Sequence, residues 1–81
     1  MIDYQTLKKR YIATIQFGLL VNANYGPEPA KRANDTLHKF CEDCVDNSSY
    51  SELDKQNMKR ELEAVKEALS QEIDQYFHVW Q

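Results

Sequence analysis

Three residues near the middle of the chain have the types and the spacing of a metal site. His38, Cys41 and Cys44 are each three residues from the next, so on a helix they share one face. An imidazole and two thiolates can bind zinc, and His78 is the remaining histidine that could complete four ligands. The alternative is a pair of core thiols, because the cysteines continue a hydrophobic stripe and a helix spreads them along its axis. We favour core thiols over a metal site.

The same residues do not favour an enzyme. A reactive Cys-x-x-Cys pair usually lies at a helix N-terminus, whereas this pair is expected near a helix C-terminus, beside acidic residues that raise a thiol pKa. Two glycines cannot build a phosphate-binding loop, and the carboxylates lie among lysines without an apolar pocket to tune one of them as an acid. A helical chain of 81 residues also leaves little room for a cleft. We therefore expect neither catalysis nor a cofactor.

Acidic residues gather around the second expected loop. Glu42, Asp43 and Asp46 precede this loop, and Glu52 and Asp54 follow it. Acids between rigid helices could mask a basic surface of a partner protein and accelerate association by electrostatic steering. The alternative is that these residues serve turn chemistry alone. A second candidate contact surface is aromatic, because tyrosine and tryptophan are common interface anchors. Its members are Tyr25, Tyr50, Tyr76, Phe77 and Trp80.

The basic residues suggest a different partner, nucleic acid. The net charge is −3, but residues 1–32 carry five bases against two acids, and residues 33–81 carry eleven acids against five bases. A nucleic-acid-binding regulator could use the bases of the first part. However, their two clusters are expected at opposite ends of antiparallel helices, where they cannot converge on one phosphate backbone. These bases are Lys8, Lys9, Arg10, Lys31 and Arg32.

The longest expected element is a helix over about residues 50–80, where neither glycine nor proline occurs. Ser49, followed three residues later by Glu52, predicts a capping box at its start. The helix should be roughly 45 Å long, so its aromatic end should overhang the other helices unless it kinks near Ser70. Either the chain folds back over that overhang or another protein covers it. The expected apolar stripe consists of Leu53, Met58, Leu62, Val65, Leu69, Ile73, Tyr76 and Trp80.

A first helix is expected over about residues 3–24, with Asp3 as its N-cap. Gly18 inside it marks either a close crossing of two helix backbones or a tolerated defect. Leu20 and Val21 widen its apolar stripe, so this helix should be central in the bundle or partly covered by another chain. The stripe itself consists of Tyr4, Leu7, Tyr11, Ile15 and Leu19.

A second helix is expected over about residues 28–46, after a loop in which Gly26 can adopt positive φ and two prolines can begin a helix. Its small residues near the start should allow close approach to a neighbour. The apolar face that we expect it to pack into the core consists of Ala30, Ala33, Leu37, Phe40, Cys41 and Cys44.

These elements predict an all-α fold, a small antiparallel three-helix bundle with a long C-terminal helix, in one domain over residues 1–81. The longest apolar run, over residues 17–21, is too short to span a membrane. In size, charge and helix content the chain resembles small acidic immunity, antitoxin and phage-encoded inhibitor proteins. We expect a non-enzymatic module that masks a basic partner protein, and a cytoplasmic location because the sequence shows no signal segment. The alternatives are a structural or adaptor protein that forms a homodimer through its long helix, and the nucleic-acid-binding regulator.

Overall fold

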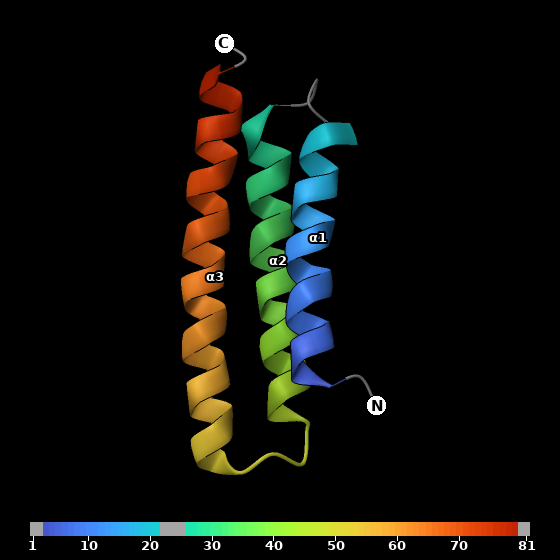
Figure 1. Ribbon diagram of the computed structural model, residues 1–81, viewed down its shortest axis with the longest axis vertical. Coiled ribbons are helices and arrows are strands. Elements are labelled where there is room, and N and C mark those ends of the chain that lie inside the picture. Colours follow the sequence, from blue (N-terminus) through green and yellow to red (C-terminus); the bar gives the residue numbers. More distant parts are fainter. Residues whose placement is uncertain (1–2, 22–25, 80–81) are drawn as a thin grey trace.

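The protein folds into three helices that lie side by side. A computed structural model describes residues 3–21 and 26–79, and within these ranges it contains no strand. The helices are α1 (Tyr4–Val21), α2 (Pro27–Asp46) and α3 (Glu52–Val79). Successive helices run in opposite directions, and α3 is the longest, at 28 residues against 18 and 20 (Figure 1). The predicted all-α three-helix bundle is confirmed.

Capping side chains and a proline explain where the helices start, and one of the expected caps is wrong. The backbone N–H of Thr6 donates to a carboxylate oxygen of Asp3 at 2.9 Å, which confirms Asp3 as the N-cap of α1. Gly26 has φ 81° and directly precedes Pro27, the first residue of α2. The expected capping by Ser49 is wrong, because α3 begins two residues later than that cap requires. The Oγ of Ser51 accepts the backbone N–H of Asp54 at 3.1 Å and is the cap.

The core contains the stripe expected for α1 and most of the one expected for α3. All five stripe residues of α1 are buried, and they pack against Leu62, Leu69 and Ile73 of α3. Leu53 departs from the expectation, because it lies in the first turn of α3 and is 67% exposed. Gly18 does not mark a close helix crossing, since a Cβ built there meets nothing within 4 Å.

The face that α2 turns to the core differs from the expected one. Its buried residues are Asn34, His38, Cys41 and Val45, whereas the expected Phe40 is 56% exposed. Two of the four buried side chains are polar, so the apolar pattern alone located the centre of the face incorrectly. The remaining apolar residues of α2 lie beside the core, along the side of α2 that borders α1.

The aromatic end of α3 is covered within the chain and is not an unsupported overhang. Phe77 is 8% exposed and belongs to the core cluster. Its ring packs edge-on against the half-buried Tyr76 at 5.2 Å between centroids. The helix also runs without interruption through Ser70, where a kink was the alternative to an overhang. Trp80, the last residue of the expected stripe, lies outside the described residues.

Candidate protein-binding surface

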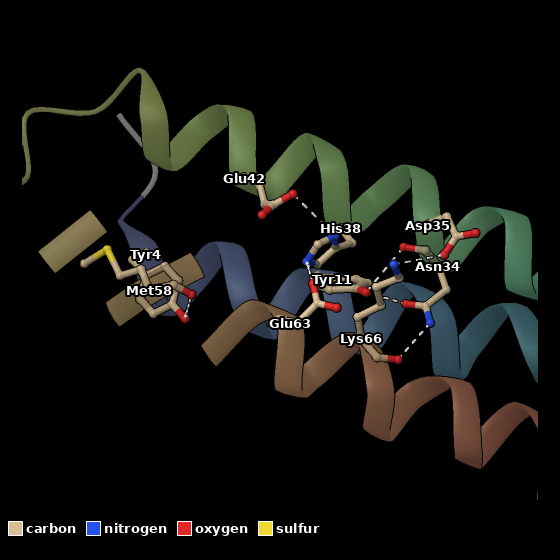
Figure 2. Close-up of polar contacts among 9 residues, drawn as sticks. All are labelled: Tyr4, Tyr11, Asn34, Asp35, His38, Glu42, Met58, Glu63 and Lys66. Atoms are coloured by element: carbon tan, nitrogen blue, oxygen red, sulfur yellow. Dashed lines mark hydrogen bonds and ion pairs between the residues drawn. The ribbon is translucent and has the colours of Figure 1, made fainter. Parts of the chain in front are cut away.

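His38 and the two cysteines have different surroundings. His38 is 6% exposed, with its Nδ1 3.6 Å from Glu42 and its Nε2 3.2 Å from Glu63 of α3 (Figure 2). The Nε2 contact lacks the geometry of a hydrogen bond. Cys41 is buried, and desolvation raises the pKa of its thiol to about 11, with a further contribution from Cys44. A buried thiol of this kind is a poor nucleophile at neutral pH.

No group of three or more histidine, cysteine, aspartate or glutamate side chains within the described ranges is arranged to hold a metal ion. The expected fourth ligand, His78, is exposed near the C-terminal end of α3. His38 and the two cysteines therefore share a helix without converging on one point. Cys41 packs in the core, and His38 lies between Glu42 and Glu63.

A central polar layer connects all three helices. The hydroxyl of Tyr11 on α1 donates to the side-chain oxygen of Asn34 on α2. The side-chain amide of Asn34 donates in turn to the main-chain oxygen of Lys66 on α3, at 3.1 Å (Figure 2). Burial is the main cause that raises the pKa of Tyr11. Tyr11 and Asn34 are each 2% exposed, and these groups supply one another's hydrogen bonds.

A second polar cluster fixes the start of α1. The hydroxyl of Tyr4 donates to Glu61 at 2.6 Å, and the Nζ of Lys8 lies 2.9 Å from the same carboxylate oxygen. These two hydrogen bonds hold the pKa of Glu61 below its ordinary value of 4.5. The hydroxyl of Tyr50 accepts the backbone N–H of Tyr4 at 3.2 Å, so the predicted aromatic anchor Tyr50 also supports this end of the bundle.

The predicted acidic residues lie at the end of the bundle that carries the 47–51 connection, here called the loop end (Figure 1). They are not equally available to a partner. Asp46 lies 2.5 Å from the Nζ of Lys59, and Glu52 lies 3.9 Å from the Nζ of Lys55. Glu42 faces His38. Within the described ranges, Asp43 and Asp54 are the exposed members of the set without an ion pair.

An apolar groove opens directly beside these acids. It has a volume of about 540 Å³ and lies between the start of α1, the end of α2 and the 47–51 connection. We call it the loop-end groove. Tyr4, Leu7, Phe40, Cys44 and Tyr50 supply most of its apolar lining, and Asp43, Asn47 and Ser48 supply polar groups. The structure thus brings Asp43 and Tyr50, which were predicted as contacts of two different kinds, to one site.

Sequence reasoning missed Phe40 and Cys44 of α2 as lining residues of this groove. The signal was present, because α2 carries more apolar residues than one core-facing stripe requires. Those in excess were assigned to the core. The apolar pattern did not show that Asn34 and His38 are buried. Because these two residues belong to the buried face of α2, Phe40 lies outside that face and is exposed to solvent.

The other predicted contact residues do not form a single surface with the groove. Phe77 is buried, so it cannot act as an exposed anchor, and Tyr76 is half-buried beside it. Both lie near the end of α3 that is opposite the loop end (Figure 1). Tyr25 and Trp80 lie outside the described residues.

The basic residues form no continuous patch. Lys8 lies near the loop end and pairs with Glu61, while Lys31 lies near the opposite end and pairs with Asp74 at 2.7 Å. Lys9, Arg10 and Arg32 are exposed and lack an ion pair among the described residues. A single stretch of nucleic acid backbone would need these bases on one track.

None of the described helices is both long and apolar enough to cross a membrane. Comparison with known proteins finds no match, whether against models of protein families, curated proteins or solved structures. The function has to be argued from the residues themselves.

Proposed function

We propose that this protein is a non-enzymatic binding module that masks a basic partner protein, as small inhibitor, immunity and antitoxin proteins do. The observation that carries the proposal is the position of Asp43. It is an exposed carboxylate without an ion pair among the described residues, and it lines the apolar loop-end groove.

The groove supplies the anchor of the proposed interface. Phe40 is 56% exposed at its edge, where an apolar side chain of a partner could cover it. A few well-packed aromatic contacts usually supply most of the binding energy at a protein interface. The half-buried Tyr50 forms one wall of the groove, and its hydrogen bond with Tyr4 already fixes the position of its side chain. Binding therefore costs little further side-chain entropy at this wall.

The acids would orient the partner protein and raise the rate at which it associates. Asp43 and Asp54 have no ion pair within residues 3–21 and 26–79, whereas lysines already offset Asp46 and Glu52. A basic partner would gain most from Asp43, because burying this carboxylate beside a lysine or arginine of the partner satisfies both charges. Rim charges mainly raise the association rate, and that contribution falls as salt rises.

The test is capture of a partner by tagged protein from its native cells at low salt, with two pairs of variants. Asp43→Lys reverses the charge in the groove, and Glu67→Lys makes the same change in net charge at an exposed position of α3 without an ion pair among the described residues. Phe40→Ser removes the aromatic edge, and Leu53→Ser removes a side chain of similar exposure on α3, 67% against 56%.

We expect one basic protein in equimolar amount, lost with Asp43→Lys and Phe40→Ser and retained with Glu67→Lys and Leu53→Ser. Equal retention by all four variants would place the interface elsewhere. Recovery of nucleic acid in place of a protein would contradict the proposal and favour the regulator.

A further inference from the structure

The C-terminal end of α2 carries negative charge that the chain offsets on one side only. The last carbonyl groups of a helix give its C-terminus a partial negative charge, so basic residues are favoured there and acids are not. The last turn of α2 holds no basic residue, yet it holds Asp43 and Asp46. The Nζ of Lys59 lies 2.5 Å from Asp46, and Lys55 donates to the main-chain oxygen of the same residue at 3.0 Å. These lysines of α3 offset Asp46 but not Asp43.

The carboxylate of Asp43 has no partner within residues 3–21 and 26–79. Its main-chain oxygen accepts hydrogen bonds from the backbone and the side chain of Asn47, but its carboxylate accepts none. Lys39 lies one turn earlier on α2 and forms no ion pair with it among the described residues. Asp43 is also the charged residue in the lining of the loop-end groove. An unfavourably placed charge therefore borders an apolar groove without a cation.

An aromatic ring lies next to this carboxylate. Phe40 precedes Asp43 by three residues, which places their Cβ atoms about 5–6 Å apart on the surface of a helix. Phe40 is 56% exposed, and both side chains line the groove. A cation is attracted both by the face of an aromatic ring and by a carboxylate. One ligand group in the groove could contact the two together.

The chain fills a similar pair of groups by itself at the start of α1. The Nζ of Lys8 lies 5.7 Å from the centre of the Tyr4 ring and 2.9 Å from the carboxylate of Glu61. The ring and the carboxylate thus share one cation. Phe40 and Asp43 offer the same two kinds of group, and no basic side chain lines their groove.

We propose that an arginine of the partner protein occupies the loop-end groove. Its guanidinium would lie over the ring of Phe40 and donate to the carboxylate of Asp43. Its methylene stem would lie against the apolar lining that Leu7 and Cys44 supply. This inference rests on the proposed masking function, because it names the side chain of the basic partner that the groove recognises.

The chemistry of the groove favours arginine over other occupants. A guanidinium is planar and weakly hydrated, so it can cover a ring and still donate two hydrogen bonds to a carboxylate. The ammonium of lysine is a strongly hydrated point charge without a flat face. A wholly apolar side chain would remove water from Asp43 and give its carboxylate no partner in return.

The test is a titration of the intact protein, followed by its backbone amide signals in nuclear magnetic resonance, at low salt. The probes are acetyl-Leu-Arg-Leu-amide and the same peptide with lysine or citrulline in place of arginine, each up to about 10 mM, a range that covers weak binding. Citrulline keeps the shape of arginine without its charge. Asp43→Asn removes the carboxylate charge, Phe40→Leu removes the ring, and Glu67→Gln is the control for net charge at an exposed position of α3.

We expect the arginine peptide to shift the amide signals of the groove lining. Its binding should weaken at least about fivefold with citrulline, with Asp43→Asn and with Phe40→Leu, and stay unchanged with Glu67→Gln. Circular dichroism checks that each variant stays helical, and Asp43→Asn decides the matter if Phe40→Leu unfolds. No shift with the arginine peptide, or equal binding of the citrulline or lysine peptide, would overturn the proposal.

Capture of the partner protein separates this inference from the masking function. If Asp43→Lys loses the partner but the arginine peptide does not bind the wild-type chain, the masking function stands and the arginine is wrong. If the peptide binds as expected but Asp43→Lys retains the partner, the groove recognises arginine and the masking function at this groove is wrong.

Discussion

The hydroxyl of Tyr11 is buried against the side-chain oxygen of Asn34, and this pair joins α1 to α2 within the core. Asn34 also donates to the main-chain oxygen of Lys66, so a single asparagine contacts both neighbouring helices. Any sliding of α1 or α3 along α2 would leave buried polar atoms without partners. We infer that Asn34 fixes the register of the bundle, as single buried polar residues do in coiled coils.

Asn34→Leu should destabilise the protein by about 1–3 kcal/mol, because it removes the side-chain acceptor of the Tyr11 hydroxyl and the donor to the main-chain oxygen of Lys66. The hydroxyl keeps only its longer contact, 3.3 Å, to the main-chain oxygen of residue 34. Adding Tyr11→Phe should recover part of that loss, since removing both polar partners costs less than removing one. Urea unfolding of the two single variants and the double variant measures the coupling. Strictly additive losses would show that the two side chains do not act together.

Tyr4→Phe removes the hydroxyl that donates to Glu61, and we expect a loss of about 1 kcal/mol or less near pH 7, because Glu61 is about half exposed. The hydroxyl helps to hold the pKa of Glu61 below its ordinary value of 4.5. The stabilisation is therefore complete above 4.5 and is lost as pH falls through the lowered pKa of the folded state. Urea midpoints of wild type and Tyr4→Phe should converge on acidification. A gap that widens in acid would contradict the contact.

Ser51→Ala should cost about 1 kcal/mol, because its Oγ accepts a backbone N–H in the first turn of α3. Ser49→Ala is the matched control, since Ser49 is exposed and lies outside the helix. The comparison tests which serine caps the helix, and urea unfolding of both variants is sufficient. An equal or larger loss for Ser49→Ala would restore the capping box expected from the sequence.

The two cysteines should differ strongly in reactivity. Cys41 is 1% exposed, and burial raises its pKa to about 11, whereas Cys44 is half-buried at the loop-end groove. A maleimide should therefore modify Cys44 first in the folded protein and reach Cys41 only when urea unfolds the chain. Peptide mass spectrometry assigns the order. Rapid modification of Cys41 under native conditions would show that α2 is packed differently.

The sequence predicted the fold class and the buried face of α1 correctly, because apolar residues every three or four positions leave one solution for that helix. It failed for α2, where Asn34 and His38 are buried. Their burial depends on Tyr11, Lys66 and Glu63, which lie on other helices, and no local pattern contains these contacts.

The candidate site was predicted only as separate residues. Asp43 and Tyr50 were identified from charge and residue type, but the loop-end groove between them forms only when the start of α1 meets the end of α2. Phe77 was assigned to an exposed overhang on helix length alone. Its burial depends on how α3 docks against the small residues of the other two helices.

The most direct test of the masking function is the amount of partner that Asp43→Lys and Glu67→Lys capture in parallel at low salt. Both variants change the net charge equally, so they differ only in whether the change lies in the groove. The proposal predicts at least about a tenfold loss of the basic partner for Asp43→Lys, with Glu67→Lys close to wild type. Equal capture by the two variants would contradict a binding site at the loop-end groove.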